Sequence, residues 1–305
     1  MDSDNKSNHD EKQSEILNDK SNIPVYKEPK FKKKLVMSGG GIRGISLIGV
    51  LYALEKMECL DHIEEFAGVS VGALIIALCV IGYSGCEIYE FIKLFNLSRL
   101  KSISFWNLNK YGLDTGQKIE YLLKRLIKGK GYDEDITLKK LYDLTKKKII
   151  ITTVCLNDIA ICYISHETHP NIPLYLAVRM SISLPIYYSP VFYEEKYYID
   201  GGCLNNFPIS LFDDDIDNVI GILLVENDIG SCKIENLEEY VMRVLQCIMK
   251  GINYNISKGY EKNTIKVLTD SINLINFDID SQKIDTLFLN GYNSIVNNVD
   301  KILSL

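Results

Sequence analysis

The 305-residue chain has no long apolar run, and no stretch approaches the roughly 18 apolar residues that a membrane-spanning helix requires. Residues 1–24 are polar and contain no apolar segment of a secretory signal, so we expect neither export nor a transmembrane segment. The eight cysteines form no C-x-x-C pair. Without a secretion signal, we expect them to be reduced thiols in a cytoplasmic protein.

Basic residues are fewer than acidic ones, and histidines are rare. With 34 Lys and Arg against 40 Asp and Glu, the net charge of −6 gives no indication of nucleic-acid binding through phosphates. The same charge disfavours general electrostatic attachment to an anionic membrane, although a local basic patch would still act there. Only four histidines occur and none follows His169, so the rest of the chain offers no histidine base.

The composition that remains is ordinary for a globular protein, 47% hydrophobic and 24% charged, and is sufficient for one large core. Residues 1–30 mix charges without periodicity, so we expect a disordered polar tail there. Strand and helix patterns alternate over residues 31–305, which favours a single α/β domain.

Apolar runs rich in β-branched residues predict strands, and apolar residues at helical spacing predict helices. The expected strands cover residues 32–38, 66–69, 148–155, 159–165, 196–199, 218–225 and 264–268. The expected helices cover residues 45–56, 73–81, 86–95, 117–127, 137–145, 174–181, 237–252 and 282–303. Residues 97–114 include Phe105, Trp106, Leu108 and Tyr111 among Ser, Asn and Lys, and form either a lipid-facing lid or part of the core.

Ser70 lies in Gly68-Val69-Ser70-Val71-Gly72, a G-x-S-x-G pattern between an expected strand and an expected helix. The pattern is typical of a sharp strand-to-helix turn that exposes one serine hydroxyl as a nucleophile. Gly68 and Gly72 fit this turn because side chains at their positions would clash there.

A glycine-rich loop, Gly39–Gly44, follows the first expected strand and precedes the helix over residues 45–56. Its G-x-G-x-x-G spacing matches a dinucleotide site, but Ser70 occupies the place where such a site needs an acidic residue after the second strand. Backbone N–H groups of a glycine turn at a helix N-terminus also stabilise an oxyanion. The candidate oxyanion-loop residues are Gly39, Gly40, Gly41, Arg43 and Gly44. Gly40 and Gly41 are the expected donors, and Arg43 adds charge, braces the loop or is simply a surface residue.

A serine hydroxyl attacks an ester only when a base removes its proton. His62 precedes the expected strand over residues 66–69 and would lie at the wrong end of a parallel sheet. His166 and His169 would act as the base only from an atypical position in the chain. His166 and His169 also form no zinc motif, because they are three residues apart and a proline follows. A carboxylate therefore becomes the expected base.

Asp200 is the candidate carboxylate. It ends an expected strand and is followed by Gly201 and Gly202, where α/β sheets place their active sites. The alternative interpretation is a turn aspartate that accepts backbone N–H bonds.

The glycine loop, the serine elbow, the segment Ala177–Pro185 and the Asp200-Gly201-Gly202 loop, in this order, resemble the patatin-like phospholipases over roughly residues 32–300. This resemblance implies a three-layer α/β/α fold with a central, mostly parallel sheet. It also implies a Ser-Asp dyad without histidine, and hydrolysis of acyl esters of phospholipids, lysophospholipids or neutral lipids without metal or cofactor. Carried over, Ser70 is the nucleophile and Asp200 the general base. Met180 departs from the pattern, since a small residue is commoner there.

We therefore expect a lipid acyl hydrolase of phospholipase A or lysophospholipase type, with transient contact at membrane surfaces. Three alternatives remain. They are a histidine-dependent serine esterase, a nucleotide-binding oxidoreductase, and a non-catalytic module that binds lipid or protein.

Overall fold

The structure is a computed structural model that describes residues 30–226, 233–269 and 277–304. The polar tail expected over residues 1–30 lies outside the described residues except for its last position. Residues 31–304 form one compact unit. The seven cysteines within the described ranges are free thiols, and no helix in those ranges is long and apolar enough to cross a membrane.

An eight-stranded sheet lies at the centre of this unit, with the strand order β11-β10-β2-β3-β5-β9-β8 and with β6 on β5. Its strands are β2 (Lys34–Met37), β3 (Glu65–Val69), β5 (Lys148–Cys155), β6 (Ala160–Ile164), β8 (Val191–Tyr193), β9 (Lys196–Asp200), β10 (Val219–Glu226) and β11 (Thr264–Thr269). The five strands from β11 to β5 run parallel. The shorter strands are β1 (Lys30–Phe31), β4 (Gly112–Asp114), β7 (Ile186–Tyr188) and β12 (Leu303–Ser304).

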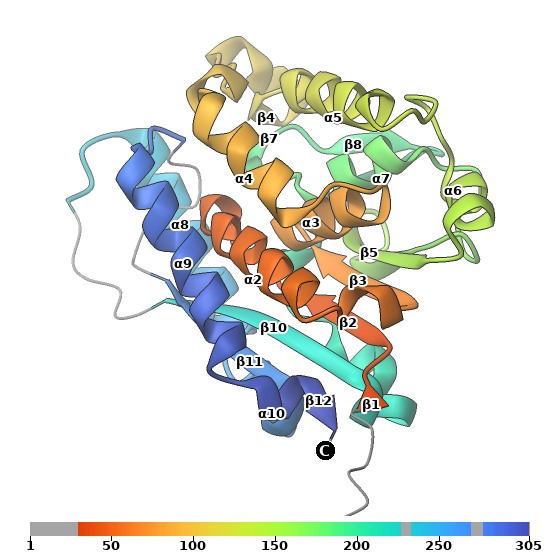
Figure 1. The fold of residues 1–305 in the computed structure, drawn as a ribbon. Coiled ribbons are helices and arrows are strands. Elements are labelled where there is room, and N and C mark those ends of the chain that lie inside the picture. The colour runs from red at the N-terminus through yellow and green to blue at the C-terminus, as the bar shows by residue number, and fades with distance from the viewer. Residues whose placement is uncertain (1–29, 227–232, 270–276, 305) are drawn as a thin grey trace, which may run out of the picture. The chain divides into compact units, whose positions relative to one another are not determined.

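Helices surround this sheet, and α2, α3, α4 and α9 cover the face turned toward the viewer in Figure 1. The α-helices are α2 (Ile45–Lys56), α3 (Val71–Val80), α4 (Gly85–Leu94), α5 (Gln117–Gly129), α6 (Leu138–Thr145), α7 (Leu174–Ser181), α8 (Leu237–Ile252), α9 (Ser281–Val296) and α10 (Val299–Ile302). The 3-10 helices are η2 (Gly41–Gly44), η3 (Leu60–His62), η4 (Leu97–Leu100), η5 (Phe105–Lys110), η6 (Gly201–Cys203), η7 (Ile209–Asn218) and η8 (Glu261–Asn263). The predicted fold class, a central and mostly parallel sheet with helices around it, is confirmed.

Two apolar clusters hold these layers together. The larger one joins the helices to the sheet, and strands such as β2 have apolar residues that are fully buried because both faces of the sheet are covered. On the other face, Ile209 and Phe212 of η7 pack against Val36 and Ala67 of the sheet. The strands that carry the site loops are therefore fixed from both sides.

Helices α2 and α9 approach each other at two glycines. A Cβ atom on Gly49 would lie 1.9 Å from the carbonyl oxygen of Phe288, and one on Gly291 would lie 1.8 Å from that of Ser46. Only glycine permits this backbone approach. Helix α9 therefore packs directly on α2, the helix that follows the glycine loop.

The strand that carries the aspartate loop differs in direction from the parallel strands. Strand β9, which ends at Asp200, runs antiparallel to β5. Asp200 pairs in register with Thr153, and Thr152 pairs with Val69, the residue before Ser70. The returning strand therefore stops level with the serine, and antiparallel pairing brings Asp200 to the same edge.

The four side chains singled out in the segment 97–114 do not form part of the core. Phe105, Trp106, Leu108 and Tyr111 are exposed, and Trp106 is 90% accessible. The segment consists of η4, η5 and β4, and β4 pairs with β7. The core alternative for these side chains is therefore wrong.

Candidate active site

Ser70 occupies a strained turn between β3 and α3. Its φ of 53° and ψ of −125° lie in a region that a residue with a side chain seldom adopts. The turn is tight, because a Cβ atom on Gly72 would lie 2.5 Å from the carbonyl oxygen of Met37, and one on Gly68 would lie 2.7 Å from the backbone nitrogen of Ala73. Local sequence thus produces the sharp turn that the G-x-S-x-G pattern predicts.

A second serine, Ser181 at the end of α7, holds this turn in place. The backbone N–H of Ser70 donates to Ser181 Oγ over 2.8 Å, and the Ser181 hydroxyl donates to the carbonyl oxygen of Thr152 over 2.6 Å. Ser181 is fully buried, so both hydrogen bonds are shielded from water. The preceding residue, Met180, is also fully buried and does not line the cavity described below.

Asp200 is buried and directed at Ser70. Its carboxyl lies beside the Ser70 side chain, which influences its pKa, and its Oδ1 accepts the N–H of Gly202 over 2.8 Å. Burial raises the pKa of Asp200 to about 6, and the Ser70 side chain and the hydrogen bond from Gly202 oppose part of this rise. Gly201 allows the close turn, since a Cβ there would lie 2.4 Å from the carbonyl oxygen of Thr152.

The glycine loop lies beside Ser70, and its first N–H is occupied. Gly39 N–H donates to the carbonyl oxygen of Asn206, and Asn206 Nδ2 donates back to the carbonyl of Gly39. Gly41 has a φ of 56°, which favours glycine, and it begins η2, where the first N–H groups have no partner inside the helix. Gly40 and Gly41 both line the cavity that contains Ser70.

Arg43 and Gly44 support this loop. Arg43 Nε donates to the carbonyl oxygen of Gly40, and its guanidinium forms a 2.8 Å ion pair with Glu226 of β10. The bracing interpretation of Arg43 fits these contacts. Gly44 lies against the elbow, because a Cβ there would come within 2.1 Å of a methyl group of Val71.

Two asparagines that the sequence analysis did not single out join the loops to one another. Asn253, just after α8, donates from Nδ2 to the carbonyl oxygen of Gly202 and accepts the N–H of Asn206 at Oδ1. Asn206 in turn holds Gly39. No local pattern marks these residues, because each one contacts a partner that is far away in the sequence.

An apolar cavity of about 320 Å³ opens at Ser70 and Asp200. Side chains of α2, α3, α4 and α5 line much of it, and Ile182 and Leu184 of the loop after α7 add part of the wall. The volume lies within the range of about 300–1,000 Å³ that is typical of small-molecule sites. The three site loops thus converge on one pocket with few polar groups.

The histidines lie elsewhere. His62 stacks on Phe31, His166 stacks on Tyr142, and His169 Nδ1 hydrogen-bonds to Thr168. None of these three histidines lines the cavity of Ser70.

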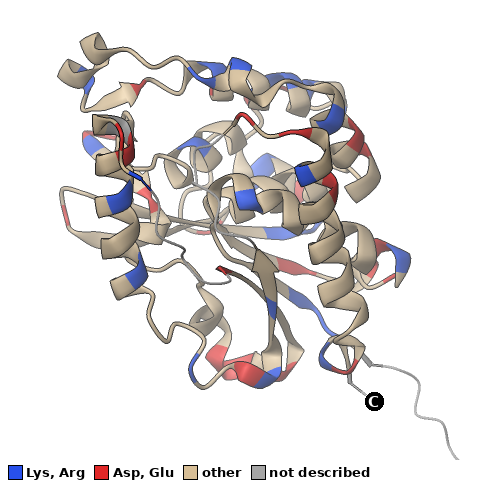
Figure 2. Ribbon diagram, turned by 90° about the vertical axis from the view of Figure 1, so that its left-hand side faces the viewer, with Lys and Arg blue, Asp and Glu red and all other residues tan. Residues whose placement is uncertain are grey.

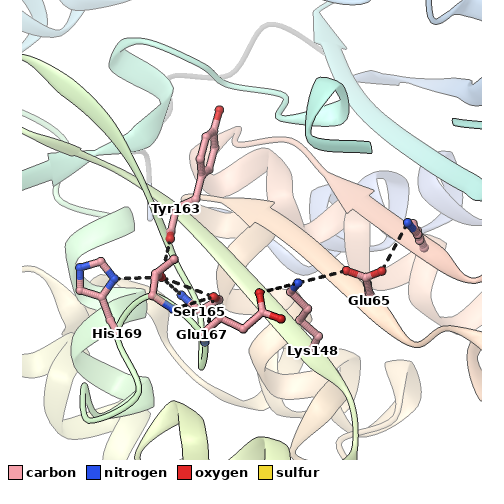
Figure 3. Close-up of polar contacts among 8 residues, drawn as sticks. Glu65, Lys148, Tyr163, Ser165, Glu167 and His169 are labelled. Carbon is pink, nitrogen blue, oxygen red and sulfur yellow. Dashed lines mark hydrogen bonds and ion pairs between the residues drawn. The ribbon is translucent and has the colours of Figure 1, made fainter. Parts of the chain in front are cut away.

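The loop that carries His166 and His169 adjoins the first residues of β3 and β5, away from the turn at Ser70. Figure 3 shows Lys148 between Glu65 and Glu167, with nitrogen-to-oxygen distances of 3.5 Å and 2.7 Å, and His169 on the adjoining loop. Glu65 and Lys148 are the first residues of their strands, whereas Ser70 follows the last residue of β3. Five strand residues span roughly 16 Å, so this loop lies far from the serine.

A known protein family matches more than half of this chain. The sequence description of the patatin-like phospholipases matches residues 35–213, which include the glycine loop, the elbow and the aspartate loop. The chain belongs to the patatin-like phospholipase family. The match ends before β10, although β10 pairs with β2 inside the sheet.

Relatives of this patatin-like chain include viral and cellular proteins. An uncharacterized protein of Acanthamoeba polyphaga mimivirus is 30% identical over 89% of this chain and 95% of its own length. A probable lipid hydrolase of Invertebrate iridescent virus 6 is 34% identical over 60% of this chain and 64% of its own length. A lysophospholipase of Meyerozyma guilliermondii is 28% identical over 58% of this chain, which corresponds to only 11% of that protein.

Solved structures share the patatin-like fold at low sequence identity. VipD from Legionella pneumophila aligns with a TM-score of 0.59 at 16% identity, covering 90% of this chain and 68% of that one. The type III effector ExoU aligns with a TM-score of 0.52 at 15% identity, covering 90% of this chain and 54% of that one. These similarities extend to the fold of nearly the whole described unit.

Proposed function

We propose that this protein is a lipid acyl hydrolase that cleaves carboxylic esters through an acyl-Ser70 intermediate, with Asp200 as the general base. The observation that carries the proposal is the buried Asp200 carboxyl beside the Ser70 side chain, which opposes part of the rise in the pKa of Asp200, in the lining of one apolar cavity. Neither His166 nor His169 lines that cavity, which favours a carboxylate base over a histidine base.

The reaction follows from the chemistry of these groups. Asp200 accepts the hydroxyl proton while Ser70 Oγ attacks the ester carbonyl, and negative charge develops on the carbonyl oxygen. The N–H groups of Gly40 and Gly41 stabilise this oxyanion, and loss of one such donor typically raises the barrier by about 2.7–4 kcal/mol. The intermediate then expels the alcohol, which takes its proton from Asp200, and leaves the acyl-serine.

Deacylation repeats these steps with water. Asp200 removes a proton from the attacking water and passes it to Ser70 Oγ as the second tetrahedral intermediate collapses, which releases a fatty acid and free Ser70. A base works best when its pKa lies near the working pH. The pKa of Asp200, raised to about 6 by burial, is closer to neutrality than that of an exposed aspartate.

The cavity supports an acyl lipid as the substrate. Its wall is aliphatic and aromatic, and the polar groups of the site stand at one end, so an acyl chain would lie inside with its ester at Ser70. The named relatives include a probable lipid hydrolase and lysophospholipases, and we assign to this chain the same class of substrate.

The test measures ester hydrolysis and covalent labelling together. Wild type, Ser70→Ala, Asp200→Asn and the control His169→Ala are compared on a short-chain p-nitrophenyl ester, a lysophospholipid and a phospholipid in detergent micelles. We expect activity and fluorophosphonate labelling in wild type and His169→Ala, and neither in Ser70→Ala. A folded Ser70→Ala protein with full activity refutes the assignment, and loss of activity in His169→Ala would revive the histidine-dependent alternative.

A further inference from the structure

Residues 97–113, which contain η4 and η5, combine exposed apolar side chains with side chains at the edge of the cavity. Leu97 and Leu100 line the cavity together with Phe277, whereas Phe105 and Trp106 are 66% and 90% exposed. One short stretch of chain thus connects the wall of the substrate site with an uncovered aromatic surface.

This surface continues onto the neighbouring strands. The ring of Tyr111 meets that of Tyr197 edge-on at 5.7 Å, and Tyr197 lies 4.9 Å from the ring of Phe192, which is also exposed. Ile186 of β7 pairs with Gly112, and it remains partly exposed with a φ of 68° that is unfavourable for a β-branched residue. The exposed side chains are therefore held outward by ordered backbone.

The charge of the segment is opposite to that of the chain. Residues 97–113 contain Arg99, Lys101 and Lys110 and no acidic residue, within a protein of net charge −6. Over the rest of the ribbon both basic and acidic residues occur, as Figure 2 shows. Helix α8 also exposes apolar side chains, but its two acidic and two basic residues balance.

We propose that residues 97–113 dock on the surface of a bilayer that contains anionic lipids, and present the cavity to acyl chains there. Aromatic side chains combined with Lys and Arg are the composition that favours the level of lipid headgroups. An anionic surface supplies the charge complementary to the three basic residues. The proposal rests on the proposed lipid hydrolase function and names the surface through which it operates.

Docking of this surface can be followed through Trp106, because it is the only tryptophan of the chain. Its fluorescence is measured with vesicles of ether-linked phosphatidylcholine, with and without ether-linked phosphatidylglycerol, which contain no ester to hydrolyse. We expect a blue shift and protection from acrylamide with anionic vesicles, in wild type and in Ser70→Ala alike. An unchanged emission while the protein sediments with vesicles overturns the proposal, because another surface then binds.

Variants separate charge, apolar contact and catalysis. Since each basic residue near an anionic surface contributes close to fivefold in affinity, the double variant Arg99→Gln/Lys110→Gln should bind vesicles about thirtyfold more weakly. Phe105→Ser should also weaken binding, whereas Leu144→Ser, an exposed leucine of α6 that does not line the cavity, should not.

Activity on a soluble p-nitrophenyl ester should stay unchanged in the double variant and in Phe105→Ser, while hydrolysis of ester-linked anionic vesicles falls. If wild type lacks soluble esterase activity but Trp106 still shifts, the proposed function fails and the docking surface stands. If the shift depends on protein concentration without vesicles, the surface binds a second copy and the docking proposal is refuted.

Discussion

Replacing the buried carboxylate Asp200 by its neutral isostere, Asp200→Asn, should abolish activity and stabilise the protein above pH 6. Burial raises the pKa of Asp200 from 3.8 to about 6, so the folded protein binds this proton more tightly than the unfolded chain. The contribution of this proton to the stability of wild type is therefore fully present below pH 3.8 and is lost as the pH rises through about 6. At 1.36 kcal/mol per pH unit, the cost approaches about 3 kcal/mol at pH 8.

Asparagine carries no charge, and its carbonyl oxygen can still accept the N–H of Gly202. Denaturant unfolding of wild type and Asp200→Asn is measured at several values between pH 4 and pH 8. The stability of the variant minus that of wild type should increase by about 2–3 kcal/mol over this range. Asp61→Asn, at an exposed aspartate of η3, provides the baseline for a carboxylate without burial cost.

Ser70→Ala should change the same curve in the opposite direction. The Ser70 side chain lowers the pKa of Asp200, so its loss raises that pKa further and increases the penalty at pH 8. A stability difference between Asp200→Asn and wild type that is equal at pH 4 and pH 8 would refute the argument that the carboxylate is desolvated.

Three further predictions address catalysis and packing. For wild type, kcat/KM should rise with pH to a plateau above about 6 as Asp200 ionises, and a profile without this limb contradicts Asp200 as the base. Ser181→Ala leaves the N–H of Ser70 without its hydrogen bond. It should lower kcat more than KM and reduce unfolding stability by about 1–3 kcal/mol, whereas unchanged values would exclude a positioning role. Gly291→Ala places a methyl group against the backbone of α2 and should destabilise by about 1–3 kcal/mol in denaturant unfolding. Gly251→Ala, where no atom lies within 4 Å of the new Cβ, should be neutral or stabilising.

Much of the fold could be predicted because local periodicity determines it. The bounds predicted for α2, α7, α8 and β5 coincide with those in the structure, since each has an uninterrupted apolar pattern. The direction of β9 could not be predicted, because the order and orientation of strands depend on pairing between distant segments. Phe105 and Trp106 carry an apolar pattern that is equally typical of a core, and only the structure shows that the described residues leave them exposed.

The residues of the site also divide into those that the sequence reveals and those that it does not. Ser70, the glycine loop and Asp200 are visible in the sequence because tight turns require glycine at fixed spacings. The residues that position them are not visible. Ser181 reaches Ser70 across 111 residues, and Asn206 reaches Gly39 across 167, through hydrogen bonds that a single sequence cannot reveal.

The position of β10 inside the sheet has a consequence for biosynthesis. Lys34 of β2 pairs with Val219 of β10, so one edge of β2 stays unpaired until about 185 more residues have been made. At about 5–20 residues per second, this interval lasts roughly 10–40 s. During that time the nascent chain contains the serine turn and the glycine loop next to an open strand edge, which is a template for aggregation. The edge of β2 is therefore protected from such pairing only after β10 has been made.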